Sequence, residues 1–553
     1  MPCTCNPLNL AYRFQLDQPF FGQVPCREAA DPSIVWYQGR FWLFASKSGG
    51  YWHSEDLHEW TFVASRSLPV EDYAPDVAVI DDALVVTAST RDEPAPIFRS
   101  CDPLGDDWQQ VCDCPAHHDP ALFQDDDGRV YRYWGCSPDQ PLFACELDRH
   151  SLLPIGETVG IPVRDVDRYG WQQRGEGHSE GHRSPHIEGP WMSKHGGRYY
   201  LEYAAPGTQY AIYSDAVLVG EAPLGPFAHQ AHNPTSYHPS GFMPGAGHGC
   251  TFQDRFGNWW HSATMRISAR HRFERRVGIW PAGFDADGVF FCNTAFGDWP
   301  RPLPQGPWDP WRDALPPWML LSHGVAARAS SVLPGHPAHL AVDEDCQTWW
   351  AATQSGPAEL ELDLGARCRV HAVQLNLAEE AATQHGRGDD LAVAWQLEGA
   401  ETRDSDWQLL VDRSQQESDR PHEYAELASP AAMRHLRLRL LRVPSGLPAV
   451  AGLRVFGHQI DGVVPRTVTG FVVTRDPQDP RNANLQWQHE PTACGYLVRW
   501  GVAAGKRYCS QLVHAANQLE LRCLDRQQDY WFSVEAWNRC GIGPATAPNG
   551  PHR

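Results

Sequence analysis

The sequence predicts an all-β protein, and three observations support this fold class. Five segments before residue 300 share one pattern, in which a polar residue at a turn precedes an apolar strand, a second turn and an aromatic strand. Helical periodicity is almost absent from the same part of the chain. Beyond about residue 320, stretches such as AELELDLG, VHAVQLNLA and HLRLRLL alternate apolar and polar residues, as short antiparallel strands do.

The five repeated segments start at Asp31, Asp76, Asp119, Glu188 and His248, which lie about 43 to 69 residues apart. A hairpin turn follows each of them within a few residues, as expected for strand–turn–strand units. Radial repetition of four-stranded sheets at this period predicts a five-bladed β-propeller. Because the innermost strand of each blade starts near the central axis, we expect these five residues to converge.

Changes in composition mark the expected domain boundaries. The Pro- and Trp-rich stretch at 299–318 is typical of a linker that packs on the propeller. A second boundary falls at GVVPRTVTG, residues 462–470. We therefore predict a propeller at 1–318, a second β domain at 319–459 and a small β-sandwich at 460–553.

Charge and length exclude several classes of partner. The chain has 553 residues and a net charge of −21, which argues against a nucleic acid or an anionic membrane, since both require basic patches. No apolar run approaches the roughly 20 residues of a membrane helix. The 23 Trp and 17 Tyr are common in carbohydrate-active proteins and equally common in β-rich ones. The sequence does not indicate an oligomeric state.

The N-terminus and the cysteines bear on the cellular compartment. MPCTCNPLNLAYRF has no charged or apolar leader region, so the chain as written is expected to be cytoplasmic, or periplasmic or secreted if a leader was removed. The 16 cysteines include the C-x-C pairs at 3–5 and 112–114, which lack the spacing of a zinc site. Free buried thiols are expected, with disulfides as the alternative in an exported protein.

Three of the carboxyl groups expected at the axis, those of Asp31, Asp119 and Glu188, suggest glycoside hydrolysis, in which two carboxyls flank the scissile bond. The acid must keep its proton near neutral pH, and a third carboxylate nearby favours this because like charges oppose ionisation. Glu188 reaches further than an aspartate and suits the acid, Asp31 would hold water beneath the sugar, and Asp119 would tune Glu188. Taken singly, an Asp-Pro at a strand start is usually only a turn device. His248, in GAGHGC, is either a packed turn histidine or a residue facing a hydrated cation or the sugar.

The motifs ADPSIV at 30–35, HDPALFQDDDGR at 118–129, IEGPWM at 187–192 and GHGCTFQD at 247–254 resemble glycoside hydrolase family 43 over about residues 6–300. The resemblance implies a five-bladed propeller of an inverting enzyme. It also implies that Asp31 is the general base, Asp119 the pKa modulator and Glu188 the general acid. No cofactor is required for this chemistry.

The same resemblance extends to binding residues. His248 matches a histidine that helps to hold a structural calcium ion through a largely water-filled shell, and Arg266 matches an arginine that binds sugar hydroxyls. Trp52 and Tyr73 are candidate pocket walls by stacking, with ordinary blade packing as the alternative. Asp76, in YAPD, matches a recurrent family position and is given a supporting role at the substrate site. The loop at 163–184 is expected to shape the pocket or to form a surface loop.

The two later domains also resemble known families. HPAHLAVDEDCQTWW, ELELDLG and GLPAVAGLRVFG resemble the discoidin or coagulation-factor C-type jelly roll, also used as family 32 carbohydrate-binding modules. That resemblance implies a structural calcium ion at Asp343 and Asp345, and leaves Trp349 and Trp350 as either core or sugar platform. The last segment resembles a fibronectin type III domain and is interpreted as a spacer. Its framework-like positions are Trp487, Tyr496, Leu524 and Tyr530.

The resemblance favours an exo-acting hydrolase that removes terminal α-L-arabinofuranosyl or β-D-xylosyl units from plant-type oligo- or polysaccharides. A β-D-galactofuranosidase or a galactan-acting member of the same fold is the alternative within the class. A non-catalytic, lectin-like carbohydrate-binding protein is the alternative of another class. The three intact acidic motifs argue against that last hypothesis.

Overall fold

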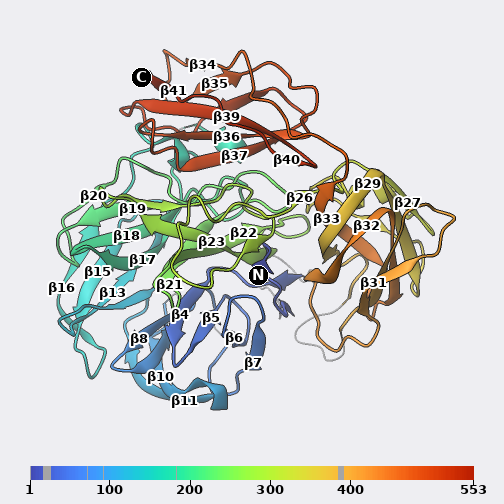
Figure 1. Cartoon of the computed structure of the whole chain (residues 1–553). Coiled ribbons are helices and arrows are strands. Elements are labelled where there is room, and N and C mark those ends of the chain that lie inside the picture. The colour runs from blue at the N-terminus through green and yellow to red at the C-terminus, as the bar shows by residue number, and fades with distance from the viewer. Residues whose placement is uncertain (1, 16–25, 71, 91, 182, 384–390) are drawn as a thin grey trace.

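The computed structural model describes residues 2–15, 26–70, 72–90, 92–181, 183–383 and 391–553 (Figure 1). Apart from four short 3₁₀ turns, all its regular elements are strands, so the all-β prediction is confirmed. No helix among these residues has the length and apolar character needed to span a membrane. All 16 cysteines are free thiols.

Five antiparallel sheets form the blades of the propeller. Blade 1 contains β4 (Ser33–Tyr37), β5 (Arg40–Phe44), β6 (Gly50–Ser54) and β7 (Thr61–Ala64), and blade 2 contains β8 (Asp76–Ile80), β9 (Ala83–Thr87), β10 (Ala95–Asp102) and β11 (Asp107–Cys114). Blade 3 contains β12 (Ala121–Gln124), β13 (Val130–Trp134), β15 (Leu142–Leu147) and β16 (Pro154–Ile161). Blade 4 contains β17 (Ile187–His195), β18 (Arg198–Ala205), β19 (Ser214–Gly220) and β20 (Phe227–His229), with β14 (Cys136–Ser137) added to β17. Blade 5 contains β21 (Gly247–Gln253), β22 (Trp259–Arg266), β23 (Arg275–Phe284) and β24 (Phe290–Cys292).

The inner hairpins of three blades have two-residue turns with positive φ at both positions. These turns are Gln38-Gly39 in blade 1, Asp81-Asp82 in blade 2 and Gly196-Gly197 in blade 4. Positive φ at both positions matches the twist of the flanking strands and favours Gly, Asn and Asp. The polar pairs in the sequence therefore set the hairpin register of these blades.

The N-terminal segment lies against blade 5. Leu8 donates a backbone hydrogen bond of 2.8 Å to Val277 of β23, and β1 (Cys3–Thr4) pairs with β25 (Arg301–Pro302) beyond the last blade. Leu8, Leu10 and Tyr12 are buried in one core with the facing strands of blades 1 and 5. The start of the chain therefore holds the first and last blades together.

Residues 319–459 form one eight-stranded sheet beside the propeller (Figure 1). Its strands are β26 (Met319–Leu320), β27 (Ala326–Ala329), β28 (Trp350–Ala351), β29 (Ala358–Leu377), β30 (Ala394–Ala400), β31 (Gln408–Arg413), β32 (His422–Arg442) and β33 (Ala449–Gln459). Trp350 is fully buried in its core, whereas Trp349 is half-buried and stacks on His336 at 5.0 Å between ring centroids.

The C-terminal residues form two sheets packed on a shared core. One sheet contains β34 (Val472–Arg475), β35 (Ala483–Gln486) and β38 (Gln518–Leu521). The other contains β36 (Gly495–Gly501), β37 (Cys509–His514), β39 (Tyr530–Asn538), β40 (Gly541–Ile542) and β41 (Asn549–His552). Trp487, Tyr496, Leu524 and Tyr530 are all buried in this core. The proposed division at 318/319 and 459/460, and the discoidin and fibronectin assignments, stay predictions.

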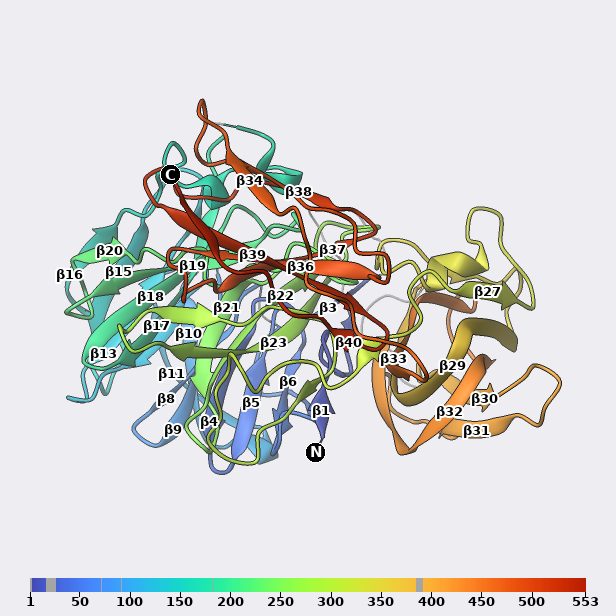
Figure 2. The ribbon, with the colours of Figure 1, turned by 45° about the horizontal axis from the view of Figure 1, so that its top comes forward.

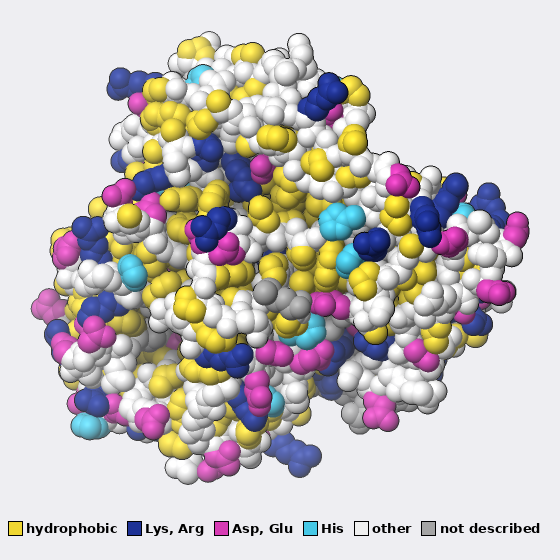
Figure 3. All heavy atoms as spheres, viewed as in Figure 1, with side chains coloured by type: hydrophobic (Ala, Val, Ile, Leu, Met, Phe, Trp, Pro, Cys, Tyr) yellow, Lys and Arg dark blue, Asp and Glu magenta, His cyan; other side chains and the backbone are white. Residues whose placement is uncertain are grey.

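The three parts of the chain pack together (Figures 1 and 2). Trp299, in the linker stretch, contacts Trp537 edge-on at 5.0 Å and lies 6.5 Å from Phe456, measured between ring centroids. Hydrophobic side chains gather where the C-terminal sheets meet the propeller, and charged side chains of both signs are interspersed over the rest of the visible face (Figure 3). The linker side chains therefore belong to a buried junction of all three parts.

Candidate active site

One backbone position recurs at the start of every blade, and it brings polar side chains to one place. Asp31, Ala74, Asp119, Gly189 and His248 all have left-handed backbone conformations, with φ between 47° and 60°. Aspartate and glycine tolerate this conformation better than most residues. The sequence motif at the blade starts is therefore first a backbone requirement, and three blades place a charged or titratable side chain on it.

Glu188 occupies the preceding position, one residue before the left-handed Gly189. The same position in blades 2 and 3 holds Tyr73 and His118, whose carbonyls accept backbone hydrogen bonds from Ser89 and Gly135. Asp76 lies two residues after the left-handed Ala74. The expected convergence is thus correct for Asp31, Asp119, Glu188 and His248, and wrong for Asp76, while Glu188 stands one residue before the left-handed position.

Hydroxyl groups tie each of three blade starts to its neighbouring blade. Thr264 accepts the backbone N–H of Asp31 at 2.8 Å, Ser46 accepts that of Ala74 at 2.8 Å, and Ser89 accepts that of Asp119 at 2.8 Å. Ser46 and Ser89 lie just beyond the second strand of the preceding blade, and Thr264 lies in the last three residues of that strand. The contact from Thr264 in blade 5 to Asp31 in blade 1 closes the ring.

These side chains line a cavity of about 260 Å³. Its lining residues are Asp31, Asp72, Tyr73, Ser89, His118, Asp119, Cys136, Glu188, Thr208, His248, Phe273 and Arg275. The three carboxyls singled out from sequence are therefore brought together although they are distributed over three blades. Tyr73 lies in the same cavity, as expected for a pocket wall.

Asp31 is buried and held as an anion. Arg275 donates to its Oδ1 at 2.9 Å and Ser46 donates to its Oδ2 at 2.7 Å. Burial alone would raise the pKa of Asp31, but Arg275, His248 and the Ser46 hydroxyl together lower it below its usual value. The carboxylate is therefore available as a proton acceptor.

Asp119 has the opposite electrostatic environment. Burial and the nearby carboxyls of Glu188 and Asp31 raise the pKa of Asp119, against the opposing influence of His248. His248 Nδ1 lies 3.4 Å from Asp31 Oδ1 and 3.8 Å from Asp119 Oδ2. Burial lowers the pKa of His248, but the carboxyls, Asp31 foremost, raise it overall. The site thus combines one stabilised carboxylate with one carboxyl that resists ionisation.

Glu188 is half-buried at the cavity wall, and both of its oxygens have donors. Tyr213 donates its hydroxyl to Oε1 at 2.7 Å, and the Cys136 thiol donates to Oε2 at 3.1 Å. Cys136 lies directly opposite Glu188 in the β14–β17 pair. The carboxyl is oriented from two sides and still faces the cavity.

The resemblance implies a calcium ion near His248, and the donor atoms around this residue show whether the imidazole can bind it directly. Calcium takes oxygen ligands, whereas Nδ1 of His248 faces Asp31 and Asp119 as an ion-pair partner. The imidazole therefore does not fit as a direct ligand, and a role through bound water stays a prediction. The mechanism proposed below uses no metal ion.

The calcium site implied at Asp343 and Asp345, in the second part of the chain, also stays a prediction. Asp343 accepts hydrogen bonds from the Thr348 hydroxyl and the Asp345 backbone, and Asp345 accepts one from the Gln347 backbone. Within the described ranges, Asp343 and Asp345 do not belong to any group of three thiol, imidazole or carboxyl ligands within mutual reach.

Three residues expected at the substrate site do not line the cavity: Trp52, Asp76 and Arg266. Trp52 is fully buried against Phe62 in the blade core, so it is not a pocket wall. Asp76 is 2% exposed and connects three blades, since it accepts from Ser33 and from the backbone of Leu122. Burial raises the pKa of Asp76 to about 7.

Arg266, expected to bind sugar hydroxyls, does not lie at the cavity. Its guanidinium pairs with Glu176 at 2.9 Å and does not line the cavity. Its cross-strand partner Arg275 lines it instead. Sequence alone missed Arg275, because β22 ends and β23 begins with an arginine, and only their side-chain partners in the folded chain distinguish the two.

The described residues of the loop at 163–184 do not line the cavity, and the loop packs on the C-terminal sheets through Arg168 and Gly170. Arg168 pairs with Asp525 at 3.0 Å, and Gly170 donates its backbone N–H to Leu524. A Cβ on Gly170 would lie 2.3 Å from the carbonyl oxygen of Arg522, so glycine is required there. The loop is a docking element between the propeller and the last domain.

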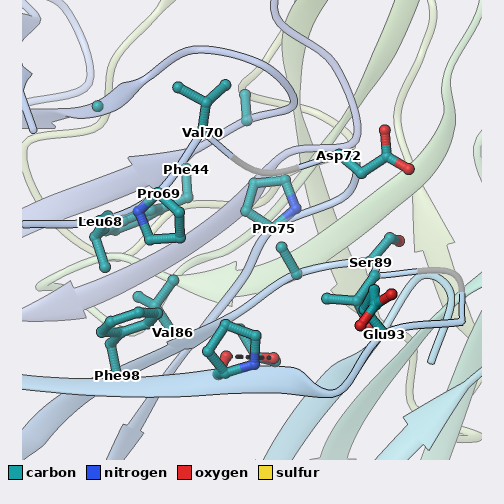
Figure 4. A pocket seen from close by; sticks show the side chains of 16 residues that line it. Phe44, Leu68, Pro69, Val70, Asp72, Pro75, Val86, Ser89, Glu93 and Phe98 are labelled. Carbon is teal, nitrogen blue, oxygen red and sulfur yellow. Dashed lines mark hydrogen bonds between the residues drawn. The ribbon is translucent and has the colours of Figure 1, made fainter. Parts of the chain in front are cut away.

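A second cavity of about 290 Å³ adjoins the first between blades 1 and 2 (Figure 4). It shares Asp72 and Ser89 with the carboxyl-lined cavity, and these polar side chains lie on one side of it. Phe44, Leu68 and Phe98 form its apolar side. Asp31, Asp119 and Glu188 do not line it, so the chemistry is assigned to the first cavity.

The fold and the cavity together define a five-bladed propeller with a carboxyl-lined axial pocket. Residues 24–290 match the family model described as Glycosyl hydrolases family 43. A β-xylosidase of Xylanibacter ruminicola is 30% identical over 129 residues, and a xylosidase/arabinosidase of Bacteroides ovatus is 29% identical over 135 residues. Each alignment covers 20% of this chain and 39% of the relative. A solved structure described as a glycoside hydrolase matches with a TM-score of 0.46 at 18% identity, covering 77% of this chain and 97% of that one.

Proposed function

We propose that the protein is an inverting, exo-acting glycoside hydrolase that removes terminal α-L-arabinofuranosyl or β-D-xylosyl units. The observation that carries this proposal is the convergence of Asp31, Asp119 and Glu188 on one cavity, with His248 between the first two. The match to the family 43 model supports a glycoside hydrolase, and the names of the two curated relatives support the choice of sugar. Tyr73 and Phe273 supply aromatic walls on which a sugar ring can pack.

The proposed reaction is a single displacement at the anomeric carbon. Asp31 takes a proton from a water molecule as the oxygen of that water attacks C1. Glu188 gives a proton to the departing glycosidic oxygen as the C1–O bond breaks. The lowered pKa of Asp31 supports its role as the base. Such proton transfers contribute about 10²- to 10⁴-fold each to the rate.

Asp119 is assigned to the cluster as modulator and orienter. Burial and the neighbouring Glu188 carboxyl raise the pKa of Asp119, so Asp119 retains a proton at a pH where an isolated aspartic acid has lost it. His248 fixes the position of Asp119 relative to Asp31. Arg275 is assigned to holding Asp31, since it also pairs with the buried Glu28 through a second face of its guanidinium.

The test is hydrolysis of three nitrophenyl glycosides: α-L-arabinofuranoside, β-D-xylopyranoside and β-D-galactofuranoside. We expect release from one of the first two, and proton NMR of the first-formed sugar should show the inverted anomer. Release from the galactofuranoside alone would move the assignment to the alternative substrate. Binding of glycans without hydrolysis of any glycoside would overturn the enzyme proposal in favour of a lectin-like protein.

A further inference from the structure

A thiol, an imidazole and a carboxyl meet at the wall of the carboxyl-lined cavity. Cys136 is the direct cross-strand partner of Glu188, and its Sγ lies 3.1 Å from Glu188 Oε2. His186 precedes Glu188 by two residues, a spacing that places both side chains on one side of an extended chain. One ligand atom from each residue lies within 4.8 Å of the other two.

We propose that Cys136, His186 and Glu188 form an inhibitory site for a soft divalent cation, Zn²⁺ in particular. Zinc binds cysteine sulfur, histidine nitrogen and carboxylate oxygen, and sites open to a fourth, water ligand have three protein ligands. Tetrahedral zinc with ordinary bond lengths separates such ligand atoms by roughly 3.3–3.7 Å. The three donors therefore need only small side-chain rotations to converge on one ion.

The donors are accessible, which separates this cluster from the other group of similar composition. Cys136, His186 and Glu188 are each half-buried, and Cys136 and Glu188 line the cavity. Across the described ranges, no hydrogen bond involves the His186 imidazole. Glu202, Asp215 and His261 form the second group, but they are at most 1% exposed and bonded to one another. An ion from solvent can therefore reach only the first group without disrupting the core.

Binding would change the chemistry of the site in a defined way. The Cys136 S–H bond breaks, the proton passes to water, and the sulfur bonds to zinc with no change of oxidation state. Glu188 releases its own proton to water as well, and its Oε2 bonds the same ion, so it cannot protonate a leaving group. The inhibition, unlike the binding, rests on the proposed function.

Cobalt(II) is the probe for binding, because a cobalt–thiolate bond gives a charge-transfer absorption band that requires no enzyme activity. We expect the full-length protein to bind one Co²⁺ with this band, and Zn²⁺ to displace it. Cys136→Ser should abolish the band, and His186→Ala should weaken cobalt binding at least ten-fold. Cys101→Ser, which removes an exposed thiol of β10, is the control and should retain both the band and the affinity.

Inhibition is measured separately, as the Zn²⁺ dependence of glycoside hydrolysis relative to each variant's own rate without metal. Wild type and Cys101→Ser should be inhibited reversibly by chelator, and His186→Ala should need at least ten-fold more Zn²⁺. A band that persists in Cys136→Ser, or equal zinc sensitivity in wild type and His186→Ala, would overturn the site. If wild type hydrolyses no glycoside, the proposed function fails while the cobalt titration still decides the site.

Discussion

Two clusters of carboxyls and a histidine lie near each other in the propeller, and they differ in what their polar atoms contact. In the open cluster, His248 lies 3.4 Å from Asp31 and 3.8 Å from Asp119, and the group faces the cavity. In the sealed cluster, His261 contacts Glu202 at 3.1 Å and Asp215 at 3.0 Å, with every side chain at most 1% exposed. The same residue types therefore differ in their remaining hydrogen-bonding capacity. In the sealed cluster, both ring nitrogens of His261 are occupied by carboxyl groups and none is left for a substrate.

The sealed cluster also positions the open one. Asp215 accepts the backbone N–H groups of His248 and Gly249 at 2.8 and 2.9 Å. This contact fixes the backbone from which the His248 imidazole projects towards Asp31 and Asp119. The comparison teaches that solvent access and remaining hydrogen-bonding capacity, rather than residue type, distinguish a reactive cluster from a structural one.

The largest expected effect is on turnover when the open cluster is changed. Asp31→Asn and Glu188→Gln should each lower kcat by about 10²- to 10⁴-fold, because each removes one proton transfer. Thermal unfolding of Glu188→Gln should change little, since glutamine keeps the shape of the side chain, whereas Asp31→Asn should also lower stability because it removes the charge paired with the buried Arg275. Steady-state kinetics and calorimetry on the same preparations measure the two effects.

Asp82→Asn is the matched control for Asp31→Asn. Asp82 is an exposed turn aspartate with a similar left-handed backbone, φ 57° against 51° for Asp31. Its replacement should leave both kcat and stability unchanged. Comparable losses in Asp31→Asn and Asp82→Asn would contradict the assignment of chemistry to the open cluster.

The second effect concerns stability and the sealed cluster. Burial opposes the charge on His261, but Asp215 and Glu202 raise its pKa to about 9. His261→Phe keeps a ring but leaves two buried carboxyls without their cation, which should cost about 3–5 kcal/mol of unfolding free energy. Denaturant titration measures this loss, with His150→Phe at an exposed position as the control.

The pH dependence of the same cluster has a defined sign. Because the folded pKa of His261 lies above its unfolded value, the stabilisation is complete below about pH 6.5 and is lost as the pH rises through about 9. The stability difference between wild type and His261→Phe should therefore shrink from pH 6 to pH 9. A difference that grows over this range would mean that His261 is neutral in the folded protein.

Much of the fold could be predicted from the sequence, because hairpin turns such as Gln38-Gly39 punctuate strands of alternating character. Asp31, Asp119 and His248 could be placed for the same reason, since each begins a repeated segment. The sequence did not show which of the paired Arg266 and Arg275 lines the cavity, nor that Glu188 stands one residue before the left-handed backbone position.

The sequence also did not show whether an aromatic side chain is buried inside a blade or lines the cavity. Trp52 and Tyr73 carry equally plausible stacking rings, yet one fills a blade core and the other lines the cavity. One informative signal was overlooked in the repeats themselves. Their second strands lead into FAS, TAS and SAT, which place Ser46, Ser89 and Thr264 at the hydroxyl contacts between blades.

The smallest expected effect tests that hydroxyl contact within the open cluster. Ser46 donates to Asp31 at 2.7 Å and helps to keep its pKa low. Ser46→Ala should therefore raise the pKa of Asp31 and move the acid limb of the kcat/KM profile to higher pH.

Ser89→Ala is the matched control, since Ser89 makes the equivalent contact to Asp119 one blade further along. That variant should leave the acid limb in place if Asp31 alone is the base. A limb that moves in Ser89→Ala and stays in Ser46→Ala would transfer the role of base to Asp119. The pair of serines therefore separates two carboxyls that share one histidine, at a cost too small to disturb the propeller around them.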